Sequence, residues 1–261
     1  MPLLDVQKER IHYVSRRRGE EHLPPVLFIH GAGGSHQHWL YQVRDLPTTV
    51  YAVDLPGHGR SDGSGRDTVG GYADWIVHFL DAAQIERAVL AGHSMGGAIV
   101  LDMALRYPER VTGLGLVSTG ARLRVAPVIL DGMRAGPEQT VHLIGDWLFG
   151  SQAPQEMVEM ARRQMAEVPA TVLHGDFLAC DAFDVRDRLD GITAPAIVVS
   201  GTEDRMTPVY LAAALRDRLP AARLHVVHGA GHMVMIERPE SVTRALGRFL
   251  ASLPAAQPPA H

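Results

Sequence analysis

The chain has 261 residues, 46% of them hydrophobic, and a formal net charge of -4 at pH 7. This length and apolar content suit one α/β domain with a sizeable core, and the charge offers no general attraction to nucleic acid or anionic membranes. Lys8 is the only lysine and stands outside any Gly-Lys-Ser/Thr context. Lysine Schiff-base enzymes and P-loop ATPases are therefore excluded.

Cysteine content and hydropathy bear on the compartment and on partners. Cys180 is the single cysteine, so no disulfide can form within the chain. The first 14 residues are charged and lack the apolar core of a secretory signal, and no apolar run approaches membrane-spanning length. We expect a cytoplasmic protein with no nucleic-acid or membrane partner. The sequence leaves its oligomeric state open.

The first half of the chain alternates apolar runs with helical patterns. Apolar runs that end at turn residues predict strands over 6–16 and on to about 29, and over 48–57 and 87–92. Apolar residues at helical spacing predict helices over 70–85 and from 96 to about Pro108.

The second half resumes this alternation after a long interruption. Strands are expected over 112–118, 194–201 and 222–229, and helices over 207–220 and 238–253. Continuously apolar strands that alternate with helices predict an α/β fold, with a mostly parallel twisted sheet covered by helices on both faces.

The interruption covers residues 121–190. It contains three amphipathic stretches separated by Gly or Pro and no convincing strand. We expect a core formed by 1–120 and 191–253, a helical cap formed by 121–190, and a disordered tail over 254–261.

The segment Gly92-His93-Ser94-Met95-Gly96 joins a predicted buried strand to a predicted helix. It matches G-x-S-x-G, in which the serine occupies a strained strand-to-helix turn and its hydroxyl stands exposed above the sheet. The start of the following helix would direct backbone N–H groups at an oxyanion formed there. Ser94 is therefore the candidate nucleophile.

A serine nucleophile needs a base, and the base needs an orienting acid. Asp204 follows one predicted strand and His232 follows the next, where active-site groups gather in open α/β sheets. Asp204 is preferred to Glu203 because only one of two adjacent loop residues can face the histidine. The other histidines nearby, His225 and His228, lie in or at the end of a strand.

Four motifs are similar to those of the α/β-hydrolase superfamily, in its single-domain serine hydrolases with a helical cap. They are HGAGG (30–34), DLPGHGRSD (54–62), GHSMGG (92–97), and the pair GTEDRMTP (201–208) with GAGHMVMIERP (229–239). The resemblance implies an α/β-hydrolase fold with Ser94, Asp204 and His232 as nucleophile, acid and base. It also implies an oxyanion hole formed by the amides of Ala32 and Met95. His30 and His58 are assigned structural roles.

Metal and cofactor sites find little support. His36-Gln37-His38 is an H-x-H segment without further ligands close by in the sequence, and the glycine-rich segments GAGGSH and GSGRDT lack the third glycine of a dinucleotide-binding motif. We expect no cofactor and no metal.

The favoured function is that of a carboxylesterase: hydrolysis of small, largely apolar carboxylic esters through an acyl-enzyme. Trp147, Met206 and Met233 are candidates for the substrate pocket, and Arg122 and Arg124 for binding a substrate carboxylate. The alternative is a C–C bond hydrolase of 1,3-dicarbonyl or dienone substrates, or an enol-lactonase. A non-enzymatic ligand receptor is a more distant alternative.

Overall fold

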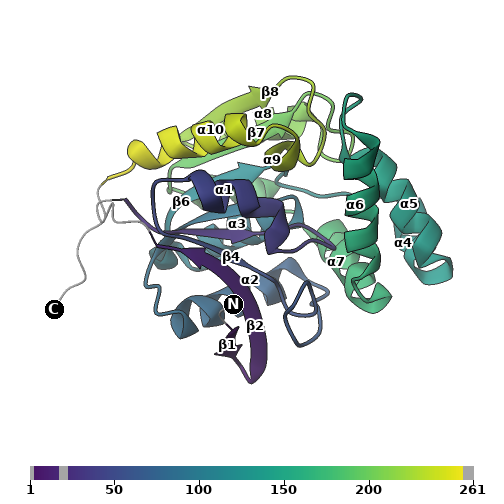
Figure 1. The fold of residues 1–261 in the computed structure, drawn as a ribbon. Coiled ribbons are helices and arrows are strands. Elements are labelled where there is room, and N and C mark those ends of the chain that lie inside the picture. The colour runs from purple at the N-terminus through teal and green to yellow at the C-terminus, as the bar shows by residue number, and fades with distance from the viewer. Residues whose placement is uncertain (1–2, 18–22, 255–261) are drawn as a thin grey trace.

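The computed structural model describes residues 3–17 and 23–254, and within them the chain forms an eight-stranded sheet (Figure 1). The strand order is β1-β2-β4-β3-β5-β6-β7-β8. The β1–β2 and β2–β4 pairs are antiparallel and all other pairs are parallel, so the sheet is mostly parallel, as predicted. The strands are β1 (Leu3–Val6), β2 (Glu9–Arg16), β3 (Val26–Ile29), β4 (Val50–Val53), β5 (Ala88–His93), β6 (Val111–Val117), β7 (Ala196–Gly201) and β8 (Ala222–Val227).

The first strand prediction needs one correction. The segment expected as a single strand from residue 6 belongs to a hairpin, in which β1 turns back into β2 at Gln7 and Lys8. Both turn residues have positive φ angles, 53° and 71°. A hairpin turn of this kind is usually marked by Asn or Gly, and Gln-Lys gives no such signal.

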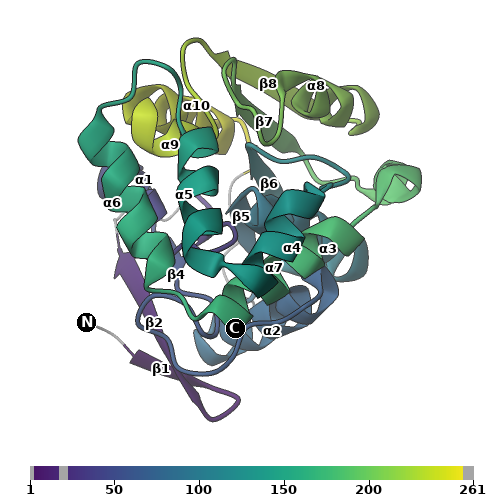
Figure 2. The ribbon, with the colours of Figure 1, turned by 90° about the vertical axis from the view of Figure 1, so that its right-hand side faces the viewer.

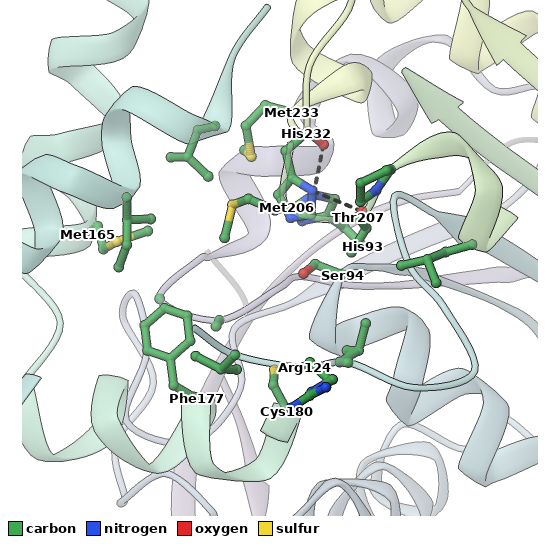
Figure 3. A pocket seen from close by; sticks show the side chains of 18 of the residues that line it. His93, Ser94, Arg124, Met165, Phe177, Cys180, Met206, Thr207, His232 and Met233 are labelled. Carbon is green, nitrogen blue, oxygen red and sulfur yellow. Dashed lines mark hydrogen bonds between the residues drawn. The ribbon is translucent and has the colours of Figure 1, made fainter. Parts of the chain in front are cut away.

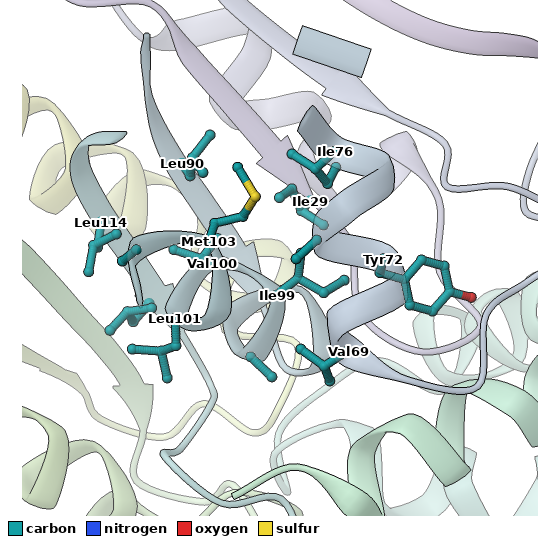
Figure 4. Close-up of a cluster of buried hydrophobic side chains, with 14 of the residues drawn as sticks. Ile29, Val69, Tyr72, Ile76, Leu90, Ile99, Val100, Leu101, Met103 and Leu114 are labelled. Atoms are coloured by element: carbon teal, nitrogen blue, oxygen red, sulfur yellow. The ribbon is translucent and has the colours of Figure 1, made fainter. Parts of the chain in front are cut away.

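Helices cover both faces of the sheet. Side chains alternate along each strand, so Leu27 and Ile29 pack with α2 and α3 while Val26 and Phe28 pack with α1 and α10. Figure 4 shows part of the first of these clusters, where Ile99 and Met103 of α3 lie between the sheet and α2. The helices of this core are α1 (Leu40–Asp45), α2 (Val69–Ala82), α3 (Met95–Arg106), α8 (Val209–Arg218), α9 (Val234–Glu237) and α10 (Pro239–Ala251).

Residues 121–190 connect the neighbouring strands β6 and β7 and hold four α-helices, which lie together at the right of Figure 1 and face the viewer in Figure 2. They are α4 (Pro127–Ala135), α5 (Pro137–Leu148), α6 (Gln155–Ala166) and α7 (Ala170–Ala182). We call this segment the helical insertion. The sequence analysis identified the first three of its helices but not α7. This helix packs against both α3 and α4, and its apolar residues are not confined to one face.

None of the helices in the described ranges is long and apolar enough to cross a membrane. The expected tail beyond Pro254 lies outside the described residues.

Candidate active site

Ser94 occupies the turn between β5 and α3 with φ 52° and ψ -116°. A positive φ is uncommon for a residue other than glycine, and strain of this kind persists only where the surroundings enforce it. Two hydrogen bonds hold the turn. The Ser94 amide donates to the Val117 carbonyl (3.0 Å), and the Thr119 hydroxyl donates to the Ser94 carbonyl (2.8 Å).

The two glycines of the motif allow the strand and the helix to approach each other. A Cβ atom on Gly92 would overlap the backbone of Gly96, and one on Gly96 would overlap the Ile29 carbonyl. The turn therefore brings Ser94 to the start of α3, where the free N–H groups and the helix dipole favour negative charge.

His232 and Asp204 meet at the ends of two neighbouring strands, β7 and β8. The Nδ1 atom of His232 lies 3.0 Å from one carboxylate oxygen of Asp204 and 3.1 Å from the other. Because an ionised carboxylate can only accept, Nδ1 carries the proton and Nε2 keeps its lone pair. This is the tautomer that a general base requires.

Asp204 is buried and fully hydrogen-bonded. It accepts from the amides of Met206 (2.9 Å) and Thr207 (2.8 Å) and from the Thr207 hydroxyl (2.7 Å). Burial alone would raise the pKa of Asp204, but His232 and these hydrogen bonds outweigh it and hold the pKa below its usual value. The carboxylate is therefore charged and oriented toward His232.

The rejected alternatives lie elsewhere. Among the described residues, the Glu203 carboxylate accepts from the Ser151 amide at 2.6 Å and not from His232. His225 contacts the Ser241 hydroxyl (2.9 Å), and His228 is exposed. Neither of these histidines contacts a carboxylate within the described residues.

The two predicted oxyanion donors flank the same space. Met95 is the first residue of α3, and Ala32 follows His30 and Gly31 in the loop after β3. Neither amide donates to a backbone or side-chain acceptor among the described residues. His30 supports this loop as expected, because its Nδ1 donates to the Gly31 carbonyl (2.8 Å) and its Nε2 accepts from the Leu55 amide (3.0 Å).

A cavity of about 310 Å³ brings these groups together (Figure 3). Ser94 and His232 open into it beside Ala32, and the predicted pocket residues Met206 and Met233 line it. The helical insertion supplies most of the facing wall: Arg122, Leu123, Arg124, Val125, Ile144, Leu148, Ala161, Gln164, Met165, Phe177, Cys180 and Arg186.

The prediction for Trp147 was wrong, because this residue does not line the cavity. Ile144 and Leu148 of the same helix do so, since residues four apart share one helix face. Trp147, one position before Leu148, is half-buried and packs against the apolar cluster that contains Val26 and Phe28.

Two histidines of the cavity wall, His38 and His93, were not predicted as site residues. Burial lowers the pKa of His38 to about 4. Burial and the neighbouring His232 lower the pKa of His93, which donates from Nε2 to the His232 carbonyl (3.0 Å). Both rings are neutral near pH 7. In the described part of the chain no carboxylate orients either one, so His232 is the better base.

Cys180 also lines the cavity, as a buried thiol whose pKa is raised by burial. It is unreactive as a nucleophile in this state.

One group of side chains in the described ranges has the spacing of a metal site. It comprises His12, His36 and Asp54, all buried. The Asp54 carboxylate already accepts from Nδ1 of His12 (2.8 Å) and of His36 (2.9 Å), and from the amides of His36 and Arg60. These bonds account for the cluster as a structural link between β2, β4 and the loop before α1.

Residues 26–245 match the sequence profile described as the Alpha/beta hydrolase family. The chain belongs to this family. This α/β-hydrolase is 31% identical to the 2-hydroxy-6-oxononadienedioate/2-hydroxy-6-oxononatrienedioate hydrolase of Paraburkholderia phymatum, with 92% of this chain and 91% of that protein covered.

Two further comparisons are informative. A solved structure described as a thermophilic esterase has 34% identity, a TM-score of 0.86 and 98% coverage of both chains. The chain is also 32% identical, over 89% of its length, to the dihydrolipoyllysine-residue acetyltransferase component of an acetoin cleaving system from Pseudomonas putida. It spans 65% of that protein. The family match and the two relatives named as a hydrolase and an esterase support a hydrolase, and they leave the bond it cleaves to be argued from the site.

Proposed function

We propose that this α/β-hydrolase cleaves small, largely apolar carboxylic esters through an acyl-enzyme intermediate. One observation carries the proposal. His232, held by Asp204, and Ser94, on its strained turn, line the same mainly apolar cavity. The relative described as an esterase supports the same reaction class.

In the proposed reaction, His232 Nε2 takes the hydroxyl proton as Ser94 Oγ attacks the ester carbonyl. Asp204 stabilises the imidazolium that results. The amides of Ala32 and Met95 hold the tetrahedral oxyanion, and each such donor typically contributes about 2.7–4 kcal/mol. The alcohol leaves with the proton from His232. Water then attacks the acyl-enzyme by the same route and releases the acid.

The cavity favours small substrates. Its volume of about 310 Å³ is at the lower end of the range of ~300–1,000 Å³ for ligand pockets. Met206 and Met233 supply flexible apolar surface beside the acid and the base. We propose that the helical insertion acts as a cap that excludes water from the bound ester.

The test is hydrolysis of p-nitrophenyl esters from acetate to dodecanoate by the wild type and Ser94→Ala. We expect turnover with an optimum at short chains, and a loss of at least about 10⁴-fold in the variant. Ester turnover that survives in Ser94→Ala would contradict the mechanism. Labelling of the wild type, but not the variant, by a fluorophosphonate would identify the nucleophile independently of substrate choice.

A second candidate is cleavage of a C–C bond or an enol-lactone in a substrate that carries a carboxylate. Arg124 favours it, because this arginine lines the cavity and makes no ion pair among the described residues. The other two cavity arginines, Arg122 and Arg186, both pair with Asp184. The relative from Paraburkholderia phymatum is named for a dicarboxylate. Turnover of a vinylogous diketone acid or an enol-lactone acid, with little ester turnover, would favour this candidate.

A further inference from the structure

Asp176 is a fully buried carboxylate that the proposed reaction does not use. It lies on α7 of the helical insertion and receives three hydrogen bonds from the core. One oxygen accepts from the Gly33 amide (2.9 Å) and from Nε2 of His58 (2.8 Å), and the other accepts from the Tyr72 hydroxyl (2.6 Å). A carboxylate is kept in such a position only where its lone pairs are satisfied.

The acceptors that face the two ring nitrogens of His58 indicate that His58 and Asp176 form an ion pair. His58 Nδ1 lies 3.0 Å from the Pro56 carbonyl, so both of its ring nitrogens face acceptors and both carry a proton. Burial opposes this charge. The Asp176 carboxylate and the Pro56 carbonyl outweigh it and raise the pKa of His58 above its usual value. The hydrogen bond to Gly33 is therefore charge-assisted, and such bonds are roughly twice as strong as neutral ones.

Gly33 directly follows Ala32, the proposed oxyanion donor. The peptide between Gly31 and Ala32 is fixed at its carbonyl, which accepts from His30 Nδ1 (2.8 Å) and from the Gly34 amide (3.1 Å). A trans peptide is planar, so its N–H points opposite to that carbonyl. The next peptide, between Ala32 and Gly33, is fixed at its N–H by Asp176. Both peptides that flank Ala32 are thus oriented.

The helical insertion also restricts Gly33 sterically. Gly33 has a φ of 63°, and a Cβ at this position would lie 2.8 Å from Leu173 of α7 and 3.1 Å from Met165 of α6. The loop is therefore packed against the insertion as well as bonded to it. A shift of α7 would act on the oxyanion loop directly.

We propose that Asp176, charge-paired with His58, is a positioning residue: it holds the peptide between Ala32 and Gly33, and together with the bonds to the Gly31 carbonyl it keeps the Ala32 amide in place. It thereby couples the position of the helical insertion to the oxyanion hole. The proposal rests on the serine-hydrolase function proposed above. Asp176 itself does not touch the reacting atoms. Its effect passes through Gly33, so its loss should weaken stabilisation of the transition state more than binding of the substrate.

The experiment compares Asp176→Ala, Asp176→Asn and Tyr72→Phe with the wild type. The readouts are the rate of fluorophosphonate labelling, kcat and KM for the best p-nitrophenyl ester, and the midpoint of thermal unfolding. Removing an oxyanion donor costs about 10²–10³-fold in kcat. For Asp176→Ala we expect at least a tenfold loss of kcat and labelling rate, with KM changed less than about threefold.

Asp176→Asn keeps an acceptor for Gly33 but not its charge, so it should lose about threefold to tenfold and recover part of the rate. Tyr72→Phe is the matched control, because it removes a hydrogen bond from the other carboxylate oxygen and leaves the bond to Gly33. It should lower the unfolding midpoint yet keep kcat within about twofold of the wild type.

Unchanged kcat and labelling rate in folded Asp176→Ala would overturn the proposal. If that variant does not fold, Asp176→Asn decides, and wild-type rates in it are the contrary result. Equal rate losses in Tyr72→Phe and Asp176→Ala would mean a general structural role and also overturn it. A wild type that neither hydrolyses esters nor reacts with fluorophosphonate would instead refute the proposed function, and with it this inference.

Discussion

The two sides of the cavity are built in different ways. On the sheet side, Ser94, Asp204 and His232 follow the strands β5, β7 and β8, and hydrogen bonds or a strained turn fix the position of each. On the side of the helical insertion, the wall consists mainly of apolar side chains from several helices, with three arginines. The first side holds groups suited to chemistry. The second side determines which molecules fit beside them.

The largest expected effect is on the sheet side. Asp204→Asn should lower kcat by about 10³–10⁴-fold, because an amide no longer holds His232 in the tautomer that leaves Nε2 free. Steady-state hydrolysis of a p-nitrophenyl ester measures this. Glu203→Gln is the control, since this adjacent carboxylate accepts from the Ser151 amide and, among the described residues, not from His232, so its loss should leave kcat nearly unchanged. Equal losses in both variants would contradict the assignment of the acid.

The helical side should affect substrate preference more than rate. Arg124→Gln is expected to lower kcat/KM by about tenfold for an ester with a distal carboxylate, and to leave a neutral ester of the same size unaffected. Arg186→Gln is the comparison, because this arginine also lines the cavity but is held by two bonds to Asp184 (2.8 and 2.9 Å). A similar loss with neutral and acidic esters would argue against a carboxylate subsite.

A smaller effect is expected for the apolar part of the same wall. Ile144→Ala enlarges the cavity, so the ratio of kcat/KM for hexanoate over acetate should rise about threefold to tenfold. Trp147→Ala should reduce stability without changing this ratio, because Trp147 packs outside the cavity. A p-nitrophenyl ester series for both variants, with thermal melts, makes the comparison. A shifted ratio in Trp147→Ala alone would contradict the described orientation of α5.

The smallest expected effect concerns the ion pair between His58 of the core and Asp176 of the helical insertion. The pKa of His58 is raised in the folded protein, so its stabilising contribution is complete below the unfolded value of about 6.5 and disappears as the pH rises through the folded value. Among the described residues, the charged or titratable groups around it are Asp176, Asp54, His30 and His38. Urea unfolding from pH 6 to 10 should show that the stability difference between wild type and Asp176→Asn decreases with pH. A difference independent of pH would contradict the ion pair.

The same contrast explains what the sequence could predict. The turn at Ser94 could be predicted because it needs glycine at positions 92 and 96, and this requirement gives a short and specific sequence pattern. Asp204 and His232 could be predicted because each follows an apolar strand, and the C-terminal ends of parallel strands lie at the same edge of the sheet. The same alternation of strands and helices predicted a mostly parallel sheet, whereas the order of the strands in it was not predicted.

The helical side was harder to predict because its lining depends on how each helix is rotated and packed. Trp147 and Leu148 are adjacent in the sequence, yet only Leu148 faces the cavity. Helix α7 was missed because it is covered on more than one side and so lacks an amphipathic pattern. Asp176 was missed with it, since its partners Gly33 and Tyr72 are more than 100 residues away in the sequence.

The place where the helical insertion joins the sheet matters for redesign. It leaves β6 and returns at the adjacent strand β7, so the insertion could be exchanged for another without reordering the sheet. A longer or shorter insertion there should change the stability little, because the entropic cost of closing a loop grows only slowly with its length. The contacts are the stricter requirement. A transplanted segment must offer a buried acceptor to the Gly33 amide in place of Asp176. It must also supply an amide to Glu237, as Gly150 does here at 2.9 Å. Grafts that keep both contacts should yield new specificities on an unchanged catalytic frame.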